Sequence, residues 1–117
     1  MADAITLIQE LFEAQARRTP QRTALVAGAQ TLSYAELDTR AERLAAALRE
    51  RGVGRGHRVG VCLERDANLL AVVLGVLKAG AAYVPLDPSF PRERLSFMAQ
   101  DAQLTLLVST AALAGPF

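Results

Sequence analysis

The stretch that decides the fold is Leu77-Lys78-Ala79-Gly80-Ala81-Ala82-Tyr83-Val84-Pro85-Leu86-Asp87-Pro88. Gly80 can adopt the left-handed conformation that ends a helix, and Lys78, the only lysine, suits the negative pole of that helix end. The residues from Ala81 to Val84 are small or β-favouring and predict a short strand. Pro85 has no amide donor, so a central strand must stop at or before it. The stretch therefore predicts a helix, a strand and a stiff exit loop in succession.

Few residues in the chain could carry chemistry. Asp87 could hold a partner group, but the favoured interpretation is that it accepts hydrogen bonds from backbone amides in a turn. Cys62 is the single cysteine and lies in an apolar run, which predicts a buried, reduced thiol and not a nucleophile. His57 is the single histidine and is assigned to a loop. We name no catalytic, cofactor-binding or metal-binding residue.

The segments just upstream are apolar and rich in glycine. Residues 67 to 79 predict a helix with almost no polar face, which must be buried on nearly all sides, and Gly75 within it indicates a close backbone neighbour. Residues 58 to 63 predict a strand covered on both faces. The glycines from Gly52 to Gly60 follow a helix and precede a strand, the reverse of a dinucleotide-binding fingerprint. They are therefore assigned to a helix end and a tight turn, and an unrelated nucleotide-binding domain is disfavoured.

Further upstream, local signals predict a helix, a hairpin and a second helix. Thr6 is a candidate cap for a first helix that ends near Arg18, and two β-rich segments, 23–26 and 30–33, predict a hairpin. Ser33 to Glu36 fits a capping box that opens a long amphipathic helix. Its apolar stripe is predicted to be core, and its polar residues are expected to face away, among them Asp38, Arg40, Glu42, Arg43 and Arg49.

Downstream of the deciding stretch, helices and strands are again predicted to alternate. Pro91 suits the first turn of a helix, residues 104 to 109 predict a strand, and Thr110 marks the start of another helix. The fold class is therefore α/β, with an N-terminal helix and β-hairpin followed by two βαβ crossover units that form a partial parallel sheet. Ligands bind beyond the carboxyl ends of such strands, so the candidate ligand side comprises residues 64–66, 85–91 and 109–110.

Length and composition predict one globular domain spanning residues 1–117. The chain is 51% hydrophobic and 21% charged, and its net charge of +1 argues against nucleic-acid and anionic-membrane partners. No export signal is recognised at the N-terminus. The most apolar stretch, residues 69 to 77, is about half of a membrane span. A cytoplasmic location is expected.

Two long motifs resemble the first two core motifs of adenylation domains from nonribosomal peptide synthetases, in the adenylate-forming (AMP-dependent) ligase superfamily. They are Leu32-Ser33-Tyr34-Ala35-Glu36-Leu37 and the deciding stretch itself. Supporting segments lie at the expected places, at residues 11–15, 19–20, 58–61 and 90–95. The sequence from Tyr83 to Pro88, followed by Phe90-Pro91, is typical of the amino-acid-activating branch of that superfamily. The resemblance implies that residues 1–117 are a single partial domain, the N-terminal segment of the large subdomain.

The resemblance also implies a function for the intact enzyme in secondary metabolite biosynthesis. Such enzymes use ATP and magnesium to convert an amino acid to its aminoacyl-adenylate, and then load it on the phosphopantetheine thiol of a carrier protein. In the family, the phosphate loop and the catalytic lysine follow later than these two motifs, and neither is recognised in residues 1–117. The implied partners are the remainder of the adenylation domain and the carrier-protein domain. The segment alone is expected to be inactive.

An alternative hypothesis is a non-catalytic binding or scaffold module that docks to the rest of a split ligase. A polar outer face on the helix of residues 67 to 79 would favour it, and the sequence lacks such a face. In a partial domain, the apolar surface that the remaining helices and strands would cover stays exposed to solvent. Marginal stability or self-association through exposed apolar surface is therefore expected.

Overall fold

The computed structural model of the chain describes residues 7–117. The elements follow the predicted order, and the predicted Thr6 cap lies outside the described residues. The elements are α1 (Ile8–Arg18), β1 (Thr23–Ala27), β2 (Gln30–Ser33), α2 (Tyr34–Glu50), β3 (Arg58–Cys62), α3 (Ala67–Lys78), β4 (Ala82–Pro85), α4 (Arg92–Asp101) and β5 (Leu106–Ser109). The strands β1 and β2 pair antiparallel, which confirms the predicted hairpin.

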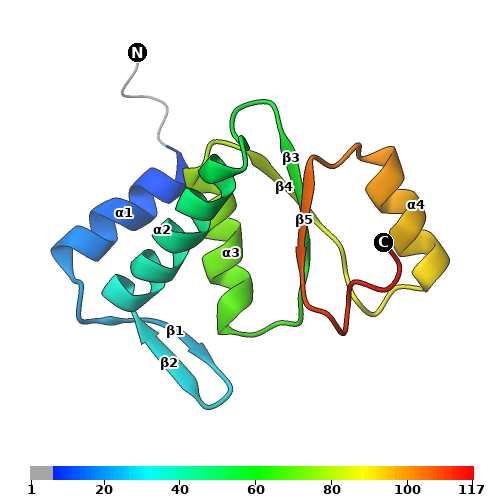
Figure 1. Cartoon of the computed structure of the whole chain (residues 1–117). Coiled ribbons are helices and arrows are strands. Elements are labelled where there is room, and N and C mark those ends of the chain that lie inside the picture. Colours follow the sequence, from blue (N-terminus) through cyan, green and yellow to red (C-terminus); the bar gives the residue numbers. More distant parts are fainter. Residues whose placement is uncertain (1–6) are drawn as a thin grey trace.

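The other three strands form a parallel sheet in the order β4-β3-β5. Figure 1 shows this sheet nearly edge-on, with α3 on one side and α4 on the other. The helices α2 and α1 lie beyond α3, on the side away from the sheet (Figure 1). The chain crosses from β3 to β4 through α3, and from β4 to β5 through α4, so the two predicted crossover units are confirmed.

The central strand β3 is buried on both faces, as predicted. Val59 and Val61 pack with residues of α2 and α3, whereas Cys62 packs with Leu86 and Leu95 on the α4 side. An added Cβ on Gly60 would lie 2.5 Å from the Cδ1 atom of Leu104. The absence of a side chain at this position therefore lets the α4 side of the core close against the strand.

The helices α2 and α3 end in the same way. Beyond α3, the amide of Gly80 donates to the carbonyl of Leu77 at 3.0 Å, and that of Ala81 donates to Val76 at 3.2 Å, which together form a Schellman motif. Gly80 has a φ of 89°, as its predicted role requires. Gly52 ends α2 with the corresponding pair of bonds and a φ of 78°. The assignment of these glycines to helix ends is confirmed.

The predicted capping box and the predicted close approach at Gly75 are also confirmed. The amide of Glu36 donates to Ser33 Oγ, and the Glu36 side chain accepts from the Ser33 amide, which is the predicted capping box. Asp66 caps α3 by accepting from the Asn68 amide at 2.9 Å. An added Cβ on Gly75 would lie 2.9 Å from both the Ala41 carbonyl oxygen and Leu44 Cβ. The helix α3 therefore packs against α2 at backbone distance.

The strand β4 stops at Pro85, as predicted, and because β4 is an edge strand its outer side needs no amide. Two predictions about individual elements need correction. Residues 110 to 114 form a single hydrogen-bonded turn and not the start of a helix. The helix α3 is covered from two sides by α2 and the sheet, so most of the cover that it needs lies within the chain. Leu70 remains 38% exposed.

Candidate functional site at the carboxyl edge of the sheet

The carboxyl ends of β3 and β4 border a groove of about 890 Å³. It is lined by residues from the predicted ligand side together with apolar residues of β3 and α3, namely Val61, Leu63, Glu64, Arg65, Leu69 and residues 85–90. The predicted loops 64–66 and 85–91 are thus brought together at one edge. Ser109 lies at the end of β5, where its hydroxyl donates to the Cys62 carbonyl at 2.9 Å. The lining is mainly apolar, with Arg65 as its one cation.

Two carboxylates of this edge, those of Asp66 and Asp87, accept hydrogen bonds from backbone amides. Asp87 accepts a hydrogen bond from the Ser89 amide at 2.9 Å, which confirms the turn interpretation. That hydrogen bond lowers the pKa of the Asp87 carboxyl, because it favours the charged form. Asp66 is occupied as the cap of α3. The hydrogen bonds that these two carboxylates accept fix the two loops.

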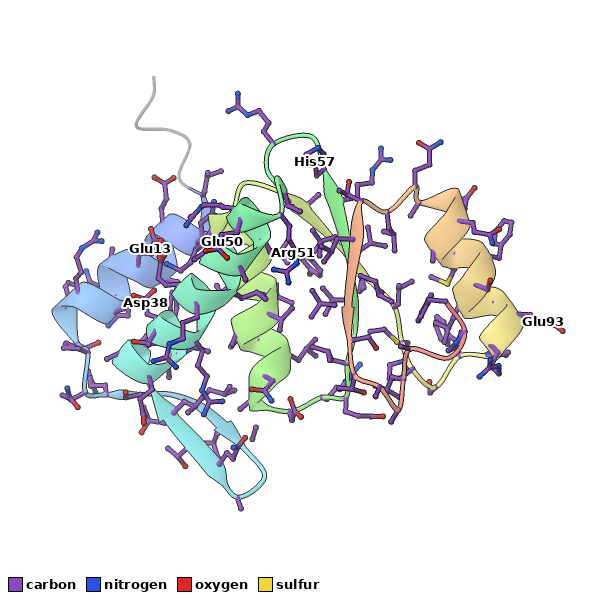
Figure 2. All side chains as sticks on the ribbon, in the orientation of Figure 1. Glu13, Asp38, Glu50, Arg51, His57 and Glu93 are labelled. Carbon is purple, nitrogen blue, oxygen red and sulfur yellow. The ribbon has the colours of Figure 1, made fainter. Side chains whose placement is uncertain are left out.

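The remaining candidates for chemistry also have structural roles. Cys62 is fully buried, and burial raises the pKa of its thiol, as predicted for an inert cysteine. His57 lies in the loop before β3 (Figure 2), where its Nδ1 accepts a hydrogen bond from the Gly54 amide at 2.9 Å. Among residues 7–117, no group of three or more His, Cys, Asp or Glu side chains is arranged to hold a metal ion. No helix within the same range is long and apolar enough to cross a bilayer.

ATP with magnesium, which the resemblance implies for the intact enzyme, does not fit the residues at this edge. Asp66 and Asp87 each accept a hydrogen bond from a backbone amide, which leaves Glu64 as the one other carboxylate at the groove. The groove offers one guanidinium, that of Arg65, and otherwise mainly apolar lining for a triphosphate.

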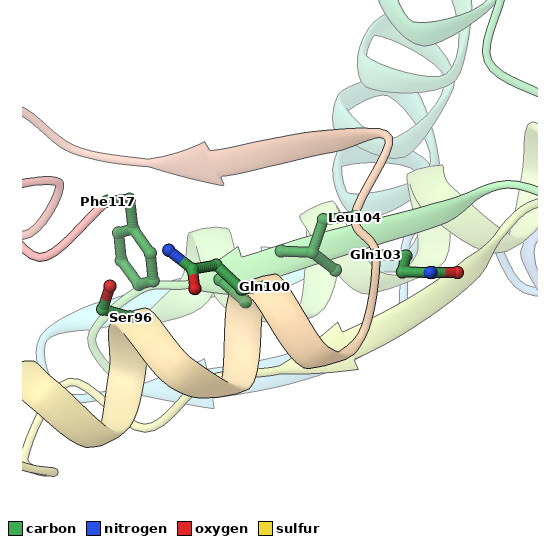
Figure 3. A pocket seen from close by; sticks show the side chains of 6 residues that line it. Ser96, Gln100, Gln103, Leu104 and Phe117 are labelled. Atoms are coloured by element: carbon green, nitrogen blue, oxygen red, sulfur yellow. The ribbon is translucent and has the colours of Figure 1, made fainter.

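A second hollow, of about 460 Å³, lies between α4 and the end of the chain. Figure 3 shows Phe117 beside Ser96 and Gln100 of α4, with Leu104 and Gln103 further along. The guanidinium of Arg92 donates to the Gly115 carbonyl at 3.1 Å and holds the last residues against α4. The hollow lies outside the predicted ligand side, and its lining includes no charged residue.

The most concentrated group of charges is one that the sequence prediction missed. The side chain of Lys78 is only 2% exposed, and its Nζ lies 2.5 Å from Glu13, 2.8 Å from Asp38 and 2.8 Å from Glu42. We call these four residues the Lys78 cluster. Glu13 and Asp38 lie between α1 and α2 (Figure 2). The cluster therefore joins three helices, α1, α2 and α3, through one ammonium group.

The Lys78 cluster corrects two sequence predictions. Asp38 and Glu42 do not face away from the core interface but converge on the lysine of α3. Lys78 is explained by these ion pairs and not by the helix pole alone. The signal that was available is that a lone lysine on an apolar helix needs a partner when buried. The two α2 carboxylates lie four residues apart, and such residues share one helix face.

Comparison with known proteins places the chain beside large synthetases. Residues 12–115 match the family described as AMP-binding enzyme. The chain is 53% identical over 105 residues to the AMB antimetabolite synthetase AmbB of Pseudomonas aeruginosa, covering 90% of this chain and 8% of that protein. It is 46% identical over 105 residues to the syringomycin synthase SyrB1 of Pseudomonas syringae pv. syringae, covering 90% of this chain and 17% of that protein.

A solved structure agrees with these relatives. The chain superposes with a TM-score of 0.88 on the nonribosomal peptide synthetase FmoA3 in its alpha-methyl-L-serine-AMP bound form. The two chains are 42% identical, and the match covers 93% of this chain and 12% of that chain. The described chain thus spans a small part of the proteins that it matches.

Proposed function

The chain belongs to the AMP-binding enzyme family, and we propose that it supplies the N-terminal segment of the large subdomain of an amino-acid adenylation domain in nonribosomal peptide synthesis. The observation that carries this proposal is the match of 93% of the chain to FmoA3 at a TM-score of 0.88. The relatives AmbB and SyrB1 support it from sequence.

In the proposed reaction of the intact enzyme, a carboxylate oxygen of the amino acid attacks the α-phosphorus of ATP. The bond from that phosphorus to the leaving pyrophosphate breaks, which gives aminoacyl-AMP. The thiolate of a carrier-protein phosphopantetheine then attacks the acyl carbon and releases AMP. The proposed partners are accordingly the remainder of the adenylation domain and a carrier-protein domain.

Within this proposal the described residues form a scaffold and contribute no reacting group. Asp66 and Asp87 at the carboxyl edge accept hydrogen bonds from backbone amides, and the thiol is buried. The single lysine is enclosed by Glu13, Asp38 and Glu42. A lysine held in this way is not available to stabilise a developing negative charge on a substrate. We therefore expect residues 1–117 to be inactive alone.

Exchange of labelled pyrophosphate into ATP tests this proposal. The isolated chain, with a panel of amino acids, should give no exchange above the background without enzyme. A chimaera tests the positive part of the proposal: residues 12–115 replace the matching segment of an active adenylation domain. Exchange should be retained in the chimaera, because the scaffold is equivalent. Exchange by the isolated chain would overturn the predicted inactivity, and a folded but inactive chimaera would contradict the scaffold assignment.

A further inference from the structure

We draw no further inference here: the strongest candidate, the outer edge of β5 in the three-stranded sheet, carries nothing because no strand pairs with it within residues 7–117 and nothing in the structure shows what covers it.

Discussion

At the scale of single residues, the ammonium of Lys78 determines how three helices meet. It is the only cation of the Lys78 cluster, and it faces carboxylates from two other helices. Burial lowers the pKa of this ammonium, but the hydrogen bonds of Asp38, Glu13 and Glu42 raise it by more, so the net shift is upward. The charged form is therefore the one that the fold stabilises.

Replacing Lys78 with methionine should destabilise the protein strongly. The side chain keeps much of its apolar volume, but three carboxylates are left facing one another without a cation. Loss of one partner of a fully buried ion pair costs about 3–5 kcal/mol, and the partial exposure of the carboxylates reduces our estimate to about 2 kcal/mol. Urea unfolding measures the change in the free energy of unfolding. The control is Glu42→Gln, which removes a half-exposed partner and should cost less than about 1 kcal/mol. Equal losses in the two variants would contradict this account.

The pH dependence of stability follows from the direction of the same pKa shift. A group whose pKa is raised by folding contributes its full stabilisation below the unfolded value, here 10.5, and loses it as the pH rises through the folded value. The difference in unfolding free energy between the native chain and Lys78→Met should therefore be constant from about pH 7 to 10 and should narrow above 10.5. Urea titrations at a series of pH values measure it. A difference that widens above pH 10.5 would show that the shift has the opposite sign.

At the scale of elements, the contact between α2 and α3 depends on Gly75. Alanine here would gain up to about 1 kcal/mol of helix propensity. Its Cβ would, however, lie 2.9 Å from the Ala41 carbonyl oxygen, and a backbone atom cannot move aside cheaply. We expect Gly75→Ala to destabilise the protein by about 1–3 kcal/mol. Gly54→Ala is the matched control, since its Cβ would meet only a contact of 3.8 Å. Thermal unfolding of both variants compares them, and a more stable Gly75→Ala would refute the packing argument.

The start of α2 allows a second prediction at this scale. Ser33 accepts a hydrogen bond from the Glu36 amide at 3.1 Å. Replacing Ser33 with alanine leaves that amide without its partner, and loss of such a cap costs about 1 kcal/mol. Ser33→Asp should restore most of the loss, because aspartate also accepts at this position. Chemical unfolding of the two variants measures both effects. An alanine variant as stable as the native chain would show that the cap contributes nothing here.

The elements were largely predictable because their signals are local. Glycine and proline mark the helix and strand ends, the capping box marks the start of α2, and periodicity separates helices from strands. The strand order β4-β3-β5 does not follow from these local signals, because it depends on the side of β3 on which β4 and β5 each come to lie. The convergence of Glu13, Asp38 and Glu42 on Lys78 was missed for a similar reason. Apolar periodicity places polar residues of one helix outward and takes no account of a cation on the neighbouring helix.

At the scale of the whole molecule, backbone amides should be most protected from hydrogen exchange in the centre of the three-stranded sheet. The strand β3 has neighbours on both edges and helices on both faces, whereas β1 and β2 form a separate two-stranded sheet. Local opening costs least where few apolar contacts are broken. At low protein concentration, amide hydrogen exchange should therefore be slowest at Val61 and Cys62 and at least about tenfold faster at Ala27 and Gln30, which pair across the hairpin. Equal protection in the hairpin would show that the molecule opens only as one unit.

The Lys78 cluster also bears on how this chain can diverge. Lys78 forms ion pairs with carboxylates from two other helices. A substitution at any one of the four positions therefore changes how much the other three residues contribute to stability. Homologous sequences that carry an apolar residue at position 78 should also have lost most of the acids at positions 13, 38 and 42. Substitutions at these four positions should therefore be correlated. In related sequences, replacement of the acidic residues should precede replacement of the lysine.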